Sequence, residues 1–279
     1  LVKNNLSQMD IERQLKKDFD VVALNMWGDL DVVDAQGNRY NEKTFAEALK
    51  VQFTPTILFF DELGKIVLRL NGYQPPRHFK TALEYVAEKK ERELDYFKFL
   101  KTKSPAATSA NKELNAEDFF SAPPYNLAHQ SGVNATPLAV FFEQRDCPNC
   151  DRLHQKVLPD KETREVIKQF KNIQLDMWSN SEIVLPGGRK LTASQWAKEL
   201  DIKYAPSIVL FDRQGKEVIR SEANFQVFHT QGIFAYVLEE SYKKQPGFQR
   251  YLSDRAEHFR EQGKDVDIWR LAGDDSERD

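Results

Sequence analysis

The stretch "LAVFFEQRDCPNCDRLHQ" (residues 138–155) decides the fold, because it holds both cysteines of the chain. Cys147 and Cys150 are separated by two residues and follow an apolar run, 138–142, which predicts a buried strand. Pro148 suits the first turn of a helix, since the amide hydrogen that proline lacks would have no partner there. We therefore expect a strand, then Cys147 at the start of a helix, with Cys150 one turn further on.

This placement favours thiol chemistry. At a helix N-terminus, free backbone N–H groups and the positive end of the helix dipole stabilise a thiolate. Cys147 is then the nucleophile that attacks a disulfide, and Cys150 is close enough to resolve the mixed disulfide that forms. Zinc is the other common use of paired cysteines, but a zinc site takes about four ligands, and only scattered histidines could complete one. We expect a redox-active disulfide and no metal or other cofactor.

The length of the chain is sufficient for two domains, each with its own hydrophobic core. At about 150 residues per domain, 279 residues predict two domains. The net charge of −3 argues against nucleic acid as a partner. No apolar run approaches the roughly 18 residues of a membrane-spanning helix, so we expect no membrane insertion. The sequence starts at Leu1, which fits a removed signal peptide or a start inside a longer product.

The chain matches itself at an offset of 151 residues: residues 24–69 align with 175–220 without a gap. Identical residues recur along the match, among them the pairs Met26/Met177, Trp27/Trp178, Gly37/Gly188, Pro55/Pro206, Asp61/Asp212, Gly64/Gly215 and, farther on, His78/His229. Repeats of 20 to 50 residues indicate solenoids, whereas a period of this length indicates a duplicated domain.

Each copy predicts the same α/β order of elements. An amphipathic stretch leads into a β-rich segment (residues 21–27 and 173–178), and a charged loop precedes a second helix. The apolar runs "TPTILFF" and "APSIVLF" follow, each ending in a hairpin turn, "DELGK" or "DRQGK". A further strand and a closing helix complete each copy. This order predicts a mixed sheet covered by helices.

The domain boundaries follow from this pattern and from composition. We expect a first domain over residues 1–100, without a CxxC pair, and a second over 121–252 that carries Cys147-Pro148-Asn149-Cys150. Residues 101–120 are rich in Ser, Ala, Thr and Asn and predict a linker. Residues 253–279 predict a charged peripheral helix and a frayed end.

These residues resemble the thioredoxin superfamily, in which a strand leads to C-P-x-C at a helix start and a later proline precedes a β run. The resemblance implies two tandem thioredoxin-like folds. It also implies that Pro206 and Pro55 are cis prolines, and that Ala205, Pro206 and Pro148 contact an extended substrate. More narrowly, "MWGD", "TPTILFFDELGKIVLRLNGY", "YFKFL" and "FQRYL" look like the periplasmic SoxW-like thioredoxins of bacterial sulfur-oxidation clusters.

The chain also departs from the superfamily's pattern. Thioredoxin carries a buried acid on the strand, six residues before the first cysteine, and Phe141 stands at that position here. Deprotonation of Cys150 must then use water or another group, such as Glu143. His154 is interpreted as a partly exposed helix residue, and Trp178 as a packing residue.

The first copy presents a gap in the pattern. At the 151-residue offset, the counterparts of Cys147 and Cys150 fall just ahead of Leu1, together with the strand before them. The first domain therefore lacks its N-terminal strand in this sequence, and a central strand is costly to omit because its neighbours lose their hydrogen-bond partners. We expect the native polypeptide to extend upstream, with a strand and a possible second C-x-x-C.

The function that these observations favour is thiol–disulfide exchange in an exported, periplasmic protein. By resemblance, the second domain reduces disulfides of periplasmic proteins and is itself kept reduced by a membrane thiol transporter. Two alternatives remain open. The pair is a disulfide oxidase or isomerase, or the first domain is a redox-inactive module that binds peptides beside Pro55.

Overall fold

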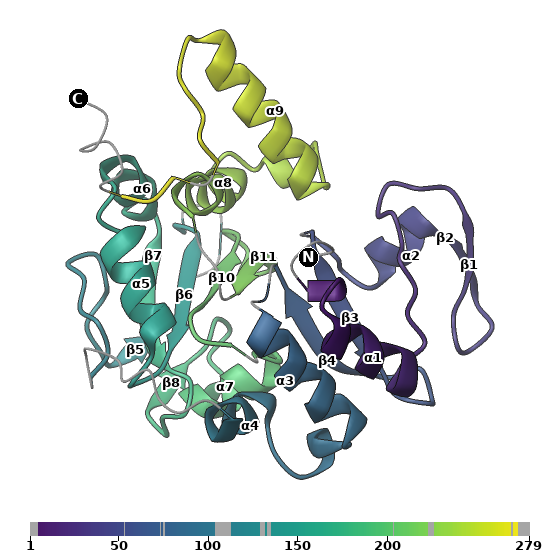
Figure 1. Cartoon of the computed structure of the whole chain (residues 1–279). Helices are drawn as coiled ribbons and strands as arrows, with labels where there is room; N and C mark the ends of the chain where they lie inside the picture. Colours follow the sequence, from purple (N-terminus) through teal and green to yellow (C-terminus); the bar gives the residue numbers. More distant parts are fainter. Residues whose placement is uncertain are drawn as a thin grey trace. The chain divides into compact units, whose positions relative to one another are not determined.

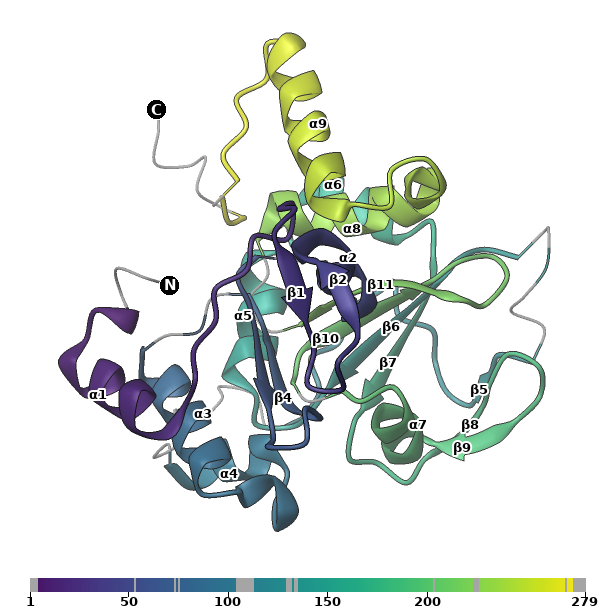
Figure 2. The same cartoon turned by 90° about the vertical axis from the view of Figure 1, so that its right-hand side faces the viewer.

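The structure is a computed structural model that describes residues 5–52, 54–72, 74, 76–103, 113–128, 132, 135–202, 204–222, 226–268 and 270–272. The chain divides into two compact units, Leu1–Ala106 and Ala107–Asp279 (Figures 1 and 2). Residues 104–112 of the expected linker and the expected frayed end (273–279) lie outside the described residues.

The second unit is a mixed α/β fold built on a four-stranded sheet in the order β11-β10-β6-β7. A small sheet, β5-β8-β9, lies beside it. The elements are β5 (Tyr125–Asn126), β6 (Leu138–Glu143), α5 (Pro148–Lys156), α6 (Lys161–Ile167), β7 (Lys171–Asp176), β8 (Glu182–Val184), β9 (Lys190–Thr192), α7 (Ala193–Glu199), β10 (Ser207–Phe211), β11 (Glu217–Glu222), α8 (Val227–Leu238), a 3₁₀ turn (Ser241–Lys243) and α9 (Phe248–Glu261).

Strand β6 forms the centre of this sheet because its sequence is apolar almost throughout. All six of its residues are buried. It pairs in parallel with β7 and antiparallel with β10, so both of its edges are hydrogen-bonded. A continuous apolar strand is typical of a sheet covered on both faces. The cysteine-bearing helix α5 follows directly, which places Cys147 at the end of the central strand.

Aromatic side chains hold a helical layer on each face of the sheet. On one face, Phe142 packs edge-on against Trp196 of α7, with 5.7 Å between ring centroids. On the other, Phe141 packs against Phe234 of α8 at 6.3 Å. Neighbouring residues of a strand point to opposite faces, so the pair Phe141-Phe142 supplies both layers.

The first unit contains α1 (Met9–Asp18), β1 (Asp31–Val33), β2 (Arg39–Asn41), α2 (Glu42–Ala48), β3 (Thr56–Phe60), β4 (Ile66–Asn71), α3 (Pro76–Ala87), a 3₁₀ turn (Lys90–Arg92) and α4 (Tyr96–Lys103). From β1 to the 3₁₀ turn, every element has a counterpart 151 residues later with the same length: for example, α3 matches α8 and β3 matches β10. Tertiary contacts recur as well. Tyr85 donates to the carbonyl of Leu94, and Tyr236 to that of Gln245. The two units therefore share one thioredoxin-like architecture.

The predicted strand at residues 21–27 is wrong, because the structure has no strand there. Its counterpart, β7, forms by pairing with β6 along its whole length. The position that corresponds to β6 precedes Leu1, so this segment meets no central strand among the described residues. Its apolar side chains are exposed instead: Val21 by 60%, Val22 by 77% and Leu24 by 43%. In the described part of this unit, β3 and β4 pair only with each other.

Residues 113–121 form a segment that packs on the second unit, although the sequence composition predicts a linker as far as residue 120. Phe120 lies 5.0 Å from the ring of Phe141, and Ser121 donates its backbone N–H to the carbonyl of Asn172. Glu117 and Asp118 both pair with Arg164. We call residues 113–121 the entry segment. Its aromatic and acidic side chains find partners that composition alone cannot indicate.

Candidate active site

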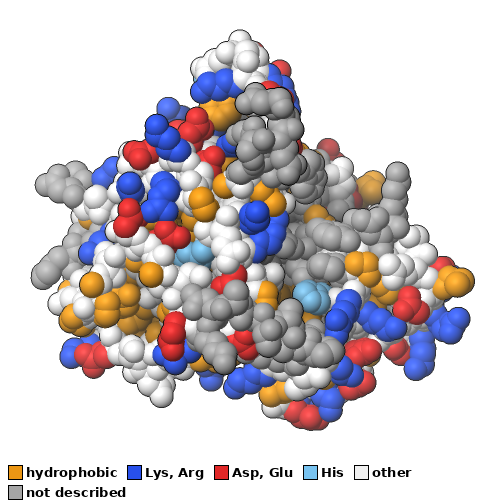
Figure 3. All heavy atoms as spheres, turned by 60° about the vertical axis from the view of Figure 1, so that its left-hand side comes forward, with side chains coloured by type: hydrophobic (Ala, Val, Ile, Leu, Met, Phe, Trp, Pro, Cys, Tyr) orange, Lys and Arg blue, Asp and Glu red, His pale blue; other side chains and the backbone are white. Residues whose placement is uncertain are grey.

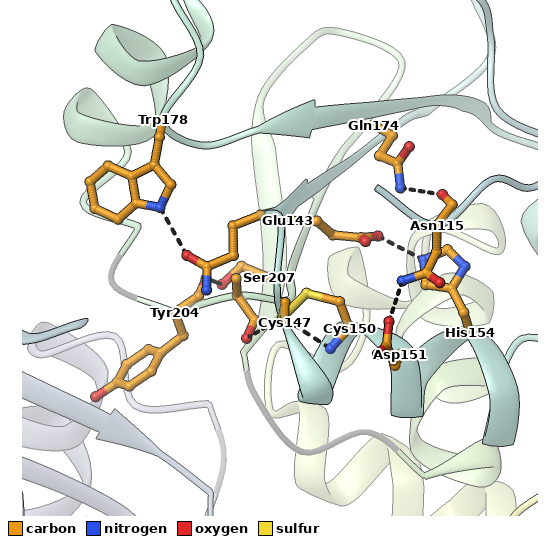
Figure 4. The surroundings of a disulfide bond; sticks show 12 residues. Asn115, Glu143, Cys147, Cys150, Asp151, His154, Gln174, Trp178, Tyr204 and Ser207 are labelled. Carbon is orange, nitrogen blue, oxygen red and sulfur yellow. Dashed lines mark hydrogen bonds and ion pairs between the residues drawn. A yellow bond between two sulfur atoms is a disulfide. The ribbon is translucent and has the colours of Figure 1, made fainter. Parts of the chain in front are cut away.

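The two cysteines lie where the central strand meets its helix (Figure 4). Cys147 is the N-cap residue of α5, and its Sγ accepts a hydrogen bond of 3.1 Å from the backbone N–H of Cys150. Pro148 occupies the first turn. One of the free N–H groups of the helix is therefore directed at the first sulfur, which is the arrangement that stabilises negative charge on it.

Cys147 and Cys150 form a disulfide, with 5.2 Å between their Cα atoms. Cys150 is fully buried, and Cys147 keeps 4% of its surface exposed. Of the two cysteines, Cys147 is therefore the one that keeps a small exposed area.

The loop before β10 forms one wall of the site. Its carbonyl at Ala205 lies 3.6 Å from the Sγ of Cys147, across 58 residues of sequence. The peptide bond between Ala205 and Pro206 is cis, as is the corresponding bond between Thr54 and Pro55. Ser207 stabilises the loop, because its hydroxyl donates a 2.7 Å hydrogen bond to the carbonyl of Tyr204. The structure thus brings Ala205 and Pro148 to the sulfurs, with Pro206 buried beside them.

A network of charged side chains lies next to the disulfide and includes His154, which is on the same helix as the cysteines (Figure 4). Glu143, on β6, has no exposed surface, and its Oε1 lies 3.0 Å from Nε2 of His154. The other ring nitrogen of His154 lies 2.9 Å from Oε1 of Glu117, in the entry segment. Glu117 in turn accepts a 2.7 Å hydrogen bond from Arg164 of α6. Four side chains from four different elements therefore form one continuous network.

The electrostatics of this network make His154 a cation. Burial by itself would lower its pKa, but the hydrogen bonds to Glu117 and Glu143 outweigh that effect and raise the pKa to about 9. For Glu117, burial acts to raise the pKa, while its bonds to His154 and Arg164 lower it by more. At neutral pH the ring of His154 is thus protonated, and its two ring nitrogens face Glu117 and Glu143.

One oxygen of this network is left open. The Oε2 atom of Glu143 is buried and has no hydrogen-bond partner among the described residues. Such an atom is costly unless a donor reaches it at some stage, since an unsatisfied buried acceptor costs about 1–3 kcal/mol. Cys150 precedes His154 by one helical turn on the buried face of α5, and His154 contacts this carboxylate through its other oxygen.

The sequence interpretation names Glu143 but misses the buried position of His154 and its contacts with Glu117 and Arg164. A partly exposed helix residue was expected, whereas His154 is 7% exposed and hydrogen-bonded at both ring nitrogens. The available signal was its spacing of four residues from Cys150, which places both side chains on one helical face. Glu117 and Arg164 gave no comparable signal, because neither is near the cysteines in the sequence.

Trp178 and Gln144 lie on the other side of the disulfide (Figure 4). The indole N–H of Trp178 donates to Oε1 of Gln144 at 2.8 Å, and the residue is 39% exposed. The expected packing role therefore describes only part of this residue, whose ring also presents apolar surface to solvent.

Across the described ranges, no group of three His, Cys, Asp or Glu side chains lies close enough together to hold a metal ion. Among the described helices, none combines the length and apolar character that crossing a bilayer requires. On the face drawn in Figure 3, acidic and basic side chains are interspersed.

The fold and the cysteine pair define a thioredoxin-type protein. The family described as "Thioredoxin-like domain" matches residues 1–87 and 126–231, well over half of the chain. The chain belongs to this family. Among solved structures, it is similar to a thioredoxin-fold protein from Helicobacter pylori, with 16% identity, a TM-score of 0.41, and coverage of 52% of this chain and 91% of that one. No curated protein matches the chain.

Proposed function

We propose that this protein is a thiol–disulfide oxidoreductase in which Cys147 is the nucleophile and Cys150 the resolving thiol. The observation that supports this most directly is the position of the first sulfur. It caps α5, accepts an N–H from Cys150 and faces the Ala205 carbonyl. A family fold with a C-P-x-C pair in this place supports thiol chemistry generally; the direction, the client and the compartment are proposals.

The proposed reaction reduces a client disulfide in two exchanges. The Cys147 thiolate attacks one client sulfur and forms a mixed disulfide with it, while the client S–S bond breaks and the other client sulfur is released as a thiolate. Cys150 then loses its proton and attacks Cys147, so the mixed disulfide breaks and the second client thiolate departs. Two electrons pass from the protein dithiol to the client, and the client thiolates take protons from solvent. A dithiol reductant must regenerate the pair.

A proton acceptor is needed for Cys150, because a fully buried thiol cannot release its proton to bulk water directly. Glu143 is the carboxylate that meets this need. It is buried, its Oε2 has no hydrogen-bond partner among the described residues, and its Oε1 contacts His154, which follows Cys150 by one helical turn. We assign it the part that the superfamily's buried acid would have played at residue 141, where this chain has Phe. Phe141 and Glu143 point to the same face of β6, one pleat apart.

The substrates we propose are disulfide-bonded proteins of the periplasm, and the reductant a membrane thiol transporter. Both follow from the resemblance to SoxW-like thioredoxins. Cis-proline loops of the superfamily bind extended client segments, so Ala205, Pro206 and Pro148 are the proposed contacts. No metal or organic cofactor takes part in the proposed cycle.

Reduction of insulin disulfides by the wild-type protein, with dithiothreitol as electron source, tests this function. We expect turnover that Cys147→Ala abolishes and that the surface variant Ser253→Ala, at an exposed position of α9, leaves unchanged. Turnover that survives Cys147→Ala would contradict the proposal. A reduction potential near about −270 mV supports a reductase, while one near about −120 mV supports the oxidase alternative.

A further inference from the structure

The buried charges behind the disulfide are more extensive than a proton acceptor requires. His154 receives Glu143 from β6 on one ring nitrogen and Glu117 from the entry segment on the other. Arg164 of α6 joins Glu117 to Asp118, and Asp151, on α5 itself, is held by Asn115 at 2.9 Å. Glu143 and Glu117 therefore hold the two ring nitrogens of His154, and Arg164 holds Glu117 in turn.

Resting on the proposed function, we propose that His154 is the positioning residue of the resolving step. Its ring lies between two carboxylates and holds Oε1 of Glu143 by a hydrogen bond, which leaves Oε2 open to take the proton of Cys150. Neither His154 nor Glu117 touches the reacting sulfurs in this scheme; each acts through Glu143.

The physical basis is the cost of burying a carboxylate. Without a nearby cation, a carboxylate with no exposed surface is driven to its protonated form, in which it cannot accept a proton. The imidazolium of His154 removes that cost by a charge-assisted hydrogen bond. Glu117 and Arg164 support this arrangement indirectly, because they keep the imidazole ring of His154 charged and oriented toward Glu143. Loss of His154 should thus act as a shift of the pH at which resolution becomes fast.

The two exchanges can be followed separately with a small aromatic disulfide whose thiolate product is coloured. Mixed with the reduced protein in a stopped-flow instrument, it releases one thiolate when Cys147 attacks and a second when Cys150 resolves the mixed disulfide. Both rates are measured over the pH range in which carboxylates and histidines titrate.

For His154→Gln we expect the second release to slow by about tenfold at neutral pH, with the loss shrinking as the pH rises, since one pKa unit corresponds to a factor of ten. The first release should change by less than about twofold, because Cys147 still caps α5 and still accepts the N–H of Cys150. The matched variant His258→Gln, at an exposed position of α9, should leave both phases unchanged. A variant that matches wild type, or that slows both phases equally at every pH, would overturn the proposal.

A double-mutant cycle tests whether His154 acts through Glu143. Glu143→Gln should slow the second release, because the carboxylate that accepts the proton is gone. Adding His154→Gln to this variant should then slow the second release only slightly further. Losses that multiply would show two independent roles and would contradict the proposal.

A variant that fails to fold, and a failure of the proposed function itself, can each be distinguished from a failure of the His154 proposal. Should His154→Gln fail to fold, Glu117→Gln keeps the ring and removes one acceptor. It should give a loss of about threefold in the second phase with the same pH pattern, and an unchanged profile would overturn the proposal. If the wild-type protein released no coloured thiolate, the proposed function would fall; if it reacted normally and only these variants had no effect, the His154 proposal alone would fall.

Discussion

The two sulfurs differ in what surrounds them, and the proposed division of labour follows from that difference. Cys147 keeps a little solvent exposure at the helix N-terminus, while Cys150 lies fully buried one turn on. A nucleophile has to be reached by its client, whereas a resolving thiol has to be reached only by the first cysteine. The exposure of each residue therefore fits one step of the exchange.

Removal of the resolving thiol should trap the client. In Cys150→Ser, the Cys147 thiolate can still attack a client disulfide, but no neighbouring sulfur can release the product. We expect a stable mixed disulfide, visible as a mass increase equal to the client on a non-reducing gel and lost on addition of dithiothreitol. Cys147→Ser should form no such adduct. An adduct formed equally well through Cys150 would show that the roles are reversed.

His154 should make the stability of the protein depend on pH. Its pKa is raised from the ordinary value of 6.5 to about 9, so the stabilisation is complete below about pH 6.5 and is lost as the pH rises through about 9. The linked free energy is on the order of 3 kcal/mol. Urea unfolding measured across this window should show the decline in wild type and a flatter profile in His154→Gln. An imidazole resonance that titrates near 6.5 would contradict the assignment.

Helix α6 depends on one side chain that links three parts of the second unit. Asp160 caps the helix by accepting the backbone N–H of Thr163 at 2.9 Å. The same carboxylate accepts from Gln231 of α8 and from Arg270, each also at 2.9 Å. A single residue thereby holds the start of α6, the packed helix α8 and the segment after α9 together.

Asp160→Ala should lower the free energy of unfolding by about 2 kcal/mol, the upper end for a lost N-cap, because it also leaves Gln231 and Arg270 without this acceptor. Asp160→Asn should cost less, since asparagine is an equally good cap and loses only the charge. Denaturant unfolding measures both variants. Equal losses for Ala and Asn would mean that the charge toward Arg270, rather than the cap, carries the effect.

At the scale of the whole chain, two units carry related elements around separate cores. Leu83 of α3 and Phe234 of α8 occupy the same position of the repeat, and both are fully buried. Phe234→Ala and Leu83→Ala each leave a cavity, with an expected loss of about 3–5 and about 2–5 kcal/mol respectively.

Calorimetry of the full chain should assign these losses to different transitions. We expect Phe234→Ala to lower the melting temperature of one transition and Leu83→Ala that of the other, since each residue packs within its own unit. Activity in the insulin assay should follow the transition that Phe234→Ala moves. A single transition shifted by both substitutions would show that the two units unfold together.

Much of this architecture could be read from local patterns. The apolar run of β6, the proline after Cys147 and the hairpin turns with Asp and Gly are signals carried by neighbouring residues, and the repeat supplied the hairpins twice. The error at residues 21–27 has a different origin: a strand needs a partner as well as a suitable composition, and this segment has none among the described residues.

Residue order alone was enough to place the two cysteines at the start of a helix and the proline in the facing loop, because their signals are short in range or recur at a constant offset. The buried network was established only by folding. Glu117 and Glu143 reach His154 across 37 and 11 residues, and Arg164 reaches Glu117 across 47. Charge pairs of this kind depend on which surfaces the packed helices and the entry segment bring into contact, and no periodicity in the chain encodes that.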